Sequence, residues 1–147
     1  MKNKTLTVYL ALFLGVLGLH RLYLKGWRDI GVWLHLLATG IGLIGLRRAF
    51  AVGQDDQLSW LLAPFFGFSL FAACLAAIVY GLMLEDKWNK AYNNKISASH
   101  TGYGLAGGTS GATIFGVILA LLIGATALMS AIAFTGQRYF EHGLKVV

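Results

Sequence analysis

Residues 5–46 read TLTVYLALFLGVLGLHRLYLKGWRDIGVWLHLLATGIGLIGL, and this stretch decides the class of fold. It contains two long apolar runs, Thr5–Leu24 and Ile30–Leu46, joined by the short segment Lys25–Asp29. Because about 20 helical residues cross the ~30 Å hydrocarbon core of a bilayer, each run predicts a membrane-spanning helix. The short connection predicts that the two helices form a tight antiparallel hairpin.

The composition of the whole chain agrees with a membrane protein. Of its 147 residues, 57% are hydrophobic and only 12% are charged, which is too apolar for a soluble domain. The low charge excludes a disordered chain, and the single Pro and single Cys exclude collagen-like and disulfide-stapled proteins. Cys74 lies in an apolar run and is interpreted as a small core residue.

Two further apolar runs, Leu58–Leu84 and Gly111–Phe134, complete the predicted fold. The fold class expected is an all-α integral membrane protein with four transmembrane helices. The run from Leu58 is longer than a bilayer requires, so it must tilt, bend at Pro64, or begin with an interfacial segment before Pro64.

Two regions are therefore expected, a helical hairpin at 1–50 and two further transmembrane helices at 51–147. An interfacial and flexible loop at 85–110 connects the last two helices. In its first part, Trp88 and Tyr92 share a helical face beside lysines, as is typical of a segment at lipid headgroups. Its second part, 97–111, is rich in Ser, Thr and Gly and predicts a flexible loop.

The net charge of +6 on so apolar a chain points to anionic lipid headgroups rather than to nucleic acid. The expected headgroup contacts are Arg47, Arg48, Trp88 and Lys90. With four spans, Lys and Arg divide equally between the two sides of the membrane, so the positive-inside rule does not decide the orientation. No signal-peptide cleavage pattern follows the first apolar run, so we expect it to remain as a membrane helix. Lys2 and Lys4 precede this helix, and we therefore expect both termini on the cytoplasmic side. The expected membrane is a bacterial inner (plasma) membrane.

One motif stands out at the end of the first run, where Gly15, Gly18, His20, Arg21 and Tyr23 occur within nine residues. The segment from Gly15 to Leu24 resembles the hallmark of the TM2 domain family, whose first helix ends in a pattern close to G-x-x-G-x-(D/H)-R-F-Y-L-G. The resemblance covers about a third of the chain and implies a two-helix membrane hairpin. It implies no enzymatic activity.

The same residues allow an interpretation of the packing and of the helix end. Ala11, Gly15 and Gly18 share one face, which predicts a groove for the second helix and its glycines 40, 42 and 45. His20 and Arg21 are expected to end the first helix at the membrane edge, and Tyr23 to anchor it there. A specific ligand or signalling role is the alternative.

His35 is an ionisable residue inside the second predicted span, and such residues are candidates for function. Its face also carries small and hydroxyl residues such as Ala38 and Thr39, so we expect it to point into protein. A hydrogen-bonded interface, a proton relay and a ligand site all remain open for it.

Catalytic and cofactor-binding patterns are not found in the sequence. The histidines are not paired at metal-ligand spacing, and no nucleophile or phosphate-binding motif occurs. The adjacent carboxylates Asp55-Asp56 and Glu85-Asp86 are interpreted as solvated loop charges. The sequence therefore predicts no enzyme, no cofactor and no metal.

A stripe of small residues on the fourth predicted span is the candidate association surface. Gly116, Ala120, Gly124, Ala127 and Ala131 project from one side of a helix and would let another backbone approach closely. Packing onto the chain's own helices is the competing interpretation.

These observations favour a non-enzymatic accessory or structural subunit of a larger membrane complex, or a homo-oligomer. Its expected partners are the bilayer and other integral membrane chains. The alternative is a small oligomeric transporter or channel with His35 near the pathway.

Overall fold

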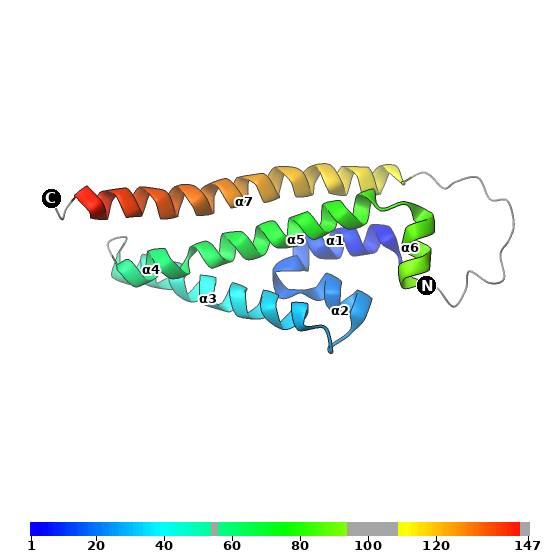
Figure 1. Ribbon diagram of the computed structural model, residues 1–147, viewed down its shortest axis with the longest axis horizontal. Helices are drawn as coiled ribbons and strands as arrows, with labels where there is room; N and C mark the ends of the chain where they lie inside the picture. Colours follow the sequence, from blue (N-terminus) through cyan, green and yellow to red (C-terminus); the bar gives the residue numbers. More distant parts are fainter. Residues whose placement is uncertain (54–55, 94–108, 145–147) are drawn as a thin grey trace, which may run out of the picture.

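The computed structural model describes residues 1–53, 56–93 and 109–144, the last three of these by their backbone only, and all structural statements below refer to these ranges. Every regular element in them is helical (Figure 1). In chain order they are α1 (Lys4–Leu14), the 3-10 helix η1 (Gly15–Leu17), α2 (Leu19–Lys25), α3 (Ile30–Val52), α4 (Gln57–Leu62), α5 (Pro64–Leu82), α6 (Glu85–Tyr92) and α7 (Gly111–Leu144).

Three of these helical units are long and apolar enough to cross a membrane. They are α3, the combined α4–α5 unit Gln57–Leu82, and residues Gly111–Glu141 of α7. The apolar helix at the N-terminus extends only over Lys4–Leu17 and is too short. The predicted count of four spans is therefore not confirmed, and the reason lies in the first apolar run.

That run does not form one helix, because the chain reverses at Gly18. Gly18 has φ 71° and ψ 13°, a left-handed conformation that glycine adopts without steric cost. Its carbonyl then accepts hydrogen bonds from Arg21 and Leu22, which start α2. We call α1, η1 and α2 together the N-terminal hairpin.

Contacts at the open end of the N-terminal hairpin show that α2 returns toward the start of α1. The backbone N–H of Asn3 donates to the Tyr23 hydroxyl at 3.1 Å, and the Lys2 ammonium donates to the Leu24 carbonyl. The hairpin expected between the first two apolar runs is thus replaced by one inside the first run. After a short turn, α3 then runs back past it (Figure 1).

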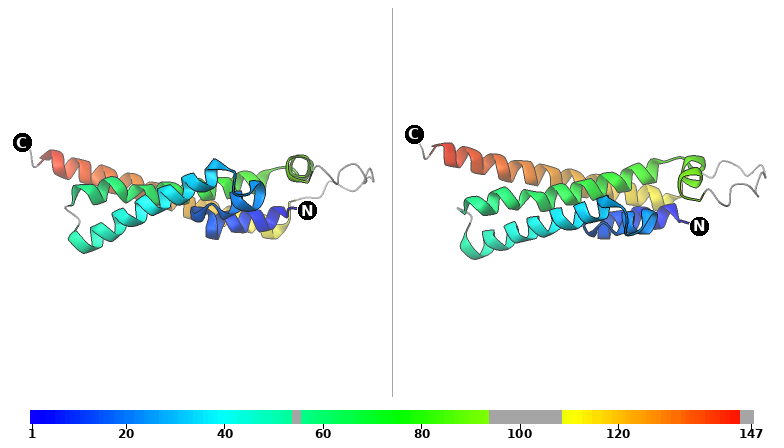
Figure 2. Two further views of the ribbon diagram at one scale, coloured as in Figure 1. Left: turned by 90° about the horizontal axis from the view of Figure 1, so that it is seen from below. Right: turned by 60° about the horizontal axis from the view of Figure 1, so that its bottom comes forward.

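The three long helices are arranged around α5. α7 follows α5 along most of its length, α3 lies on another side, and the N-terminal hairpin covers only half of the bundle (Figure 2). The core of that half consists of six tightly buried side chains, Val8, Ala11, Leu12, Cys74, Ala77 and Ala120. Cys74 is thus a core residue, as predicted.

Two glycines of α3, Gly42 and Gly45, face α5 and the end of α4 rather than the first helix. A side chain at Gly42 would overlap the backbone of Phe66, and one at Gly45 would overlap the backbone between Leu62 and Ala63. Gly40 faces open space. The predicted pairing of these glycines with the first helix is wrong, because that helix turns back before it can pass them.

Pro64 occupies the first turn of α5, where its missing N–H costs no hydrogen bond. Ala63 keeps helical backbone angles, so α4 leads directly into α5. Asp56 caps α4 by accepting from the Ser59 N–H, and it also binds Arg48 through two hydrogen bonds of 2.9 and 3.0 Å. Asp56 is therefore not a free loop charge; Asp55 lies outside the described residues.

A polar network closes the end of the bundle at which residue 1 lies, here called the N-terminal end. Trp88 of α6 is buried and donates to the Lys2 carbonyl at 3.0 Å. The buried Lys4 ammonium donates to the Met83 carbonyl at 2.6 Å and to the Thr109 hydroxyl at 3.2 Å. α6 and the start of α7 are thereby fastened to the hairpin.

The two ends of the described chain lie at opposite ends of the bundle (Figure 1). The four predicted membrane crossings would have returned the chain to the side on which it starts. Three long helices leave its two ends on opposite sides of the bundle. The end away from residue 1, formed by the end of α3, by α4 and by the last turns of α7, is called the far end.

Candidate functional site

Five polar side chains meet inside the bundle where the N-terminal hairpin reverses. We call this group the hairpin-tip cluster; it comprises His20, His35, Thr39, Ser69 and Tyr80. They come from α2, α3 and α5, and Gly15 and Gly18 make room for them. A side chain at Gly15 would overlap Ala73 of α5, and one at Gly18 would press on Val32 of α3.

His20 is the most unusual member of the hairpin-tip cluster. Its side chain is 0% exposed, and neither ring nitrogen has a hydrogen-bond partner among the described residues. Its ring lies edge to face with His35, at a centroid distance of 5.4 Å, and 6.0 Å from the ring of Tyr80. The prediction that His20 ends a helix at the membrane edge is therefore wrong, because the reversal at Gly18 carries it inside.

His35 lies beside a chain of hydroxyl groups. Its Nδ1 is 3.4 Å from the Ser69 hydroxyl, which is 2.9 Å from the Thr39 hydroxyl. Thr39 in turn donates to the carbonyl of Val16 at 2.6 Å, in the turn of the hairpin. His35 thus points into protein, and this chain of bonds ties α3 and α5 to the N-terminal hairpin.

Arg21 and Asp29 form an ion pair at the outer side of the cluster. Arg21 Nη1 lies 3.2 Å from the Asp29 carboxylate, which also caps α3 by accepting from the Gly31 N–H. Burial alone would raise the pKa of Asp29, but the hydrogen bonds from Gly31 and Arg21 outweigh it and lower that pKa. Asp29 therefore stays ionised, and it fixes both the guanidinium and the start of α3.

The small-residue stripe of α7 contacts its own chain. Side chains at Gly116 and Gly124 would approach Val8 of α1 and Cys74 of α5 to within 3 Å, and Ala120 is fully buried. Ala127 and Ala131 lie against Gly67 of α5. Gly116, Ala120 and Gly124 are thus a packing surface within the chain, as the competing interpretation predicted, whereas Ala127 and Ala131 contact α5 and also line an open groove.

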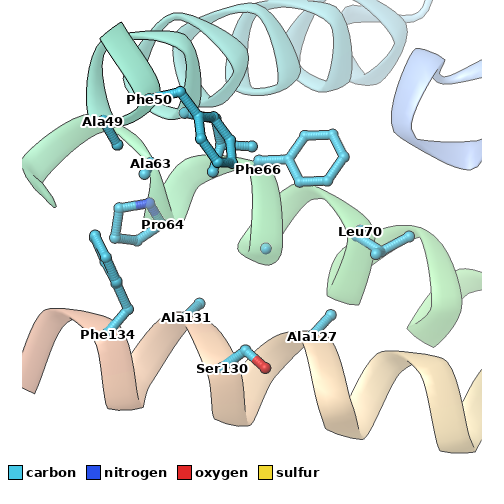
Figure 3. A pocket seen from close by; sticks show the side chains of 12 residues that line it. Ala49, Phe50, Ala63, Pro64, Phe66, Leu70, Ala127, Ser130, Ala131 and Phe134 are labelled. Carbon is cyan, nitrogen blue, oxygen red and sulfur yellow. The ribbon is translucent and has the colours of Figure 1, made fainter. Parts of the chain in front are cut away.

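A groove opens in the far half of the bundle, which the N-terminal hairpin does not reach. It has a volume of about 410 Å³ and lies between α3, α5 and α7 (Figure 3). Its small lining residues are Ala49, Ala63, Gly67, Ala127, Ser130 and Ala131, and its larger ones are Leu46, Phe50, Pro64, Phe66, Leu70 and Phe134. We call it the far groove.

The residues predicted to contact headgroups divide into two sets. Arg47 and Lys90 are exposed, as that role requires. Trp88 is buried against Tyr80 and Tyr92, and Arg48 is engaged by Asp56. The helix expected at the start of the connecting loop is present as α6, whereas residues 97–108 of the predicted flexible part lie outside the described residues.

Sequence reasoning identified the two histidines but not their polar neighbours on α5. Ser69 is a hydroxyl residue inside a strongly apolar run, and this feature of the sequence could have indicated a polar contact inside the bundle. No sequence feature distinguished Tyr80, which lies near the end of the same apolar run. Among the described side chains, no three His, Cys, Asp or Glu groups come together in a way that could hold a metal ion.

Comparison with known families confirms the resemblance seen in the sequence. A family model, the TM2 domain, matches residues 1–47, which include the N-terminal hairpin and most of α3. Comparisons with curated proteins and with solved structures found no match. The match supports a small integral membrane protein with an N-terminal TM2 domain.

Proposed function

We propose that this protein is a non-enzymatic accessory or structural subunit that packs against the transmembrane helix of another membrane chain. The observation that carries the proposal is the far groove. The N-terminal hairpin turns back at Gly18. The far half of the bundle therefore lacks the helix that a straight first run would have added there.

The lining of the far groove suits a helix. Small residues of its walls, namely alanines, a serine and a glycine, allow a foreign backbone to approach closely, and van der Waals packing of this kind holds helices together in lipid. The hydroxyl of Ser130 offers a hydrogen-bonding group on the α7 wall (Figure 3). Interhelical bonds of this type contribute roughly 0.6 kcal/mol on average.

The test is to fill the far groove and to measure association. Ala49→Leu places a larger side chain in the groove, while Ala133→Leu makes the same change on an exposed face of α7 that lines no part of it. Both variants should insert and remain helical. After extraction in mild detergent, Ala49→Leu should lose the co-purifying chain that Ala133→Leu and the wild type retain. Equal retention in both variants would contradict the proposal.

The hairpin-tip cluster favours a second candidate, a small oligomeric transporter or channel with His35 near the pathway. Buried histidines and hydroxyl groups in a membrane protein are typical of ion or proton pathways. Reconstituted wild type should then conduct protons or ions, and His35→Leu should abolish this flux while leaving assembly intact. Flux that is unchanged in His35→Leu would exclude that role for His35.

We propose further that the N-terminal end of the bundle faces the cytoplasm. Among the described Lys and Arg residues, seven lie toward this end and three toward the far end, so the positive-inside rule favours it. The seven are Lys2, Lys4, Arg21, Lys25, Arg28, Lys87 and Lys90, and the three are Arg47, Arg48 and Arg138. The expected membrane is the bacterial inner membrane.

This orientation differs from the one expected from four spans, which placed both termini in the cytoplasm. Single cysteines at Arg28 and Tyr139, in a Cys74→Ala background, would be labelled with a membrane-impermeant maleimide in intact cells. Tyr139→Cys should react from outside and Arg28→Cys only after lysis. Labelling of both positions from the same side would contradict this orientation and would support an even number of membrane crossings.

A further inference from the structure

A second hollow lies between α3 and α5, and it uses another face of α5 than the far groove. It has a volume of about 350 Å³, within the range of pockets that hold small ligands. Arg21, His35 and Ser69 supply its polar groups, and Ile30, Leu34, Phe65 and Phe68 are its exposed apolar residues. We call it the Arg21 pocket.

The polar and apolar parts of the Arg21 pocket are ordered along the bundle. Arg21 lies beside Gly31, in the first turn of α3, and the pocket continues as far as Ala38, about 10 Å along a helix. Phe65 and Phe68 belong to the first turns of α5, on the side toward the far end. A molecule lying in the pocket would therefore meet a cation near the membrane surface and aromatic rings deeper in the bilayer.

Two further cations lie close to Arg21 along the chain. Lys25 ends α2 and Arg28 lies in the turn before α3; both are exposed, and neither lines the pocket, while Asp29 is the one acidic residue of that turn. Asp29 engages Arg21 through a single nitrogen, Nη1, and Arg21 Nε is buried, so the donors left for another acceptor are those of Nη2 and the second N–H of Nη1. Arg21 is 34% exposed despite this ion pair.

We propose that the Arg21 pocket binds one anionic phospholipid of the surrounding bilayer. Its phosphate would bind Arg21, the cation that lines the pocket, and one acyl chain would lie along Phe68 and Phe65. His35 and Ser69 would face the polar glycerol-ester region between these two parts. The site is distinct from the far groove, and it goes beyond the association role proposed above.

The test compares lipids that share acyl chains and differ in headgroup charge. The full-length protein in mild detergent is titrated with phosphatidylglycerol or phosphatidylcholine, and bound lipid is counted by native mass spectrometry. One molecule of phosphatidylglycerol should bind at least about fivefold more tightly than phosphatidylcholine, the factor expected from one cation near the surface. Equal binding of the two lipids would overturn the proposal.

Two variants locate the site. Arg21→Gln should remove the preference for phosphatidylglycerol, whereas Arg47→Gln, an exposed arginine at the far end, should keep it. Ala72→Phe should fill the pocket and prevent binding without touching the ion pair, whereas Ala125→Phe on the exposed face of α7 should not. If Arg21→Gln does not fold, Ala72→Phe decides, and retention of the lipid by Ala72→Phe would overturn the proposal.

A final arm separates a lipid from a free anion. Glycerol 3-phosphate carries the charged group without acyl chains, and it should not displace the bound phosphatidylglycerol at equal concentration. Displacement by glycerol 3-phosphate would show that the pocket recognises the anion alone, and the lipid assignment would then be wrong.

Discussion

His20 and His35 meet edge to face inside the bundle, with their ring centroids 5.4 Å apart and their planes at 78°. The two rings belong to α2 and α3, which the reversal at Gly18 brings together. Had the first apolar run continued as one straight helix, His20 would have emerged at the opposite membrane surface.

The unpartnered ring nitrogens of His20 predict that an apolar ring is tolerated there. An unsatisfied buried polar group costs about 1–3 kcal/mol. We therefore expect His20→Phe to unfold at the same or a higher temperature than the wild type in detergent. His20→Ala should be destabilised by roughly 2–4 kcal/mol, because it leaves a cavity. A His20→Phe variant less stable than His20→Ala would show that the imidazole nitrogens are bonded after all.

The left-handed conformation of Gly18 predicts a sensitive position. Gly18→Ala should lower the free energy of unfolding by about 1–2 kcal/mol from the backbone alone. The new methyl group would also press on the Val32 backbone at 3.0 Å. Gly40→Ala is the matched control, since Gly40 lies in a helix and faces open space, and it should be neutral or slightly stabilising. Equal effects of the two variants in thermal unfolding would contradict the observed reversal.

The internal position of the α7 stripe predicts how it responds to bulky residues. Gly124→Ile should destabilise the protein by about 1–3 kcal/mol or more, because its Cβ would lie 2.8 Å from the Cβ of Cys74. Gly136→Ile, with nothing nearby on the same helix, should be tolerated. Resistance to limited proteolysis in membranes is the measurement. A folded Gly124→Ile variant that loses only a partner chain would return the stripe to the role of an intermolecular surface.

The Arg48–Asp56 pair predicts a loss of stability in acid. The hydrogen bond from Arg48 lowers the pKa of Asp56 below its ordinary 3.8. Asp56 therefore contributes stability above pH 3.8, and this contribution disappears as the pH falls through the lower pKa of the folded state. Unfolding midpoints measured from neutral pH down to that range should fall less steeply for Asp56→Asn than for the wild type. Parallel curves would mean that the pair contributes nothing.

The sequence predicted the α4–α5 unit and α7 better than it predicted the structure of the first apolar run. A separate helix, α4, precedes Pro64 as one of the predicted alternatives required, and the last predicted span lies within α7. A proline lacks an N–H, so its position relative to a helix start follows from local chemistry. The break at Gly18 does not follow in this way. A glycine can allow close helix packing or a backbone conformation with positive φ, and the sequence does not show which of the two applies.

The contacts of the candidate site could not be predicted from the sequence either. The sequence places Gly116 and Gly124 on one face of a helix, but periodicity does not reveal which helix covers that face. Contacts such as His35 to Ser69 join segments far apart in the chain, and they depend on how α3 and α5 pack. His20 was misplaced for one reason, namely that its depth in the membrane depends on the direction of α2.

The buried ammonium of Lys4 has a consequence for biogenesis. Its acceptor at Met83 is synthesised about eighty residues later, and the α7 residues that pack on Val8 are made later still. An 11-residue helix of about 16 Å is too short to hold its own transmembrane position in a ~30 Å hydrocarbon core. α1 is therefore made before the helices that complete its contacts, and it must stay at the membrane surface until α5 and α7 have been inserted beside it.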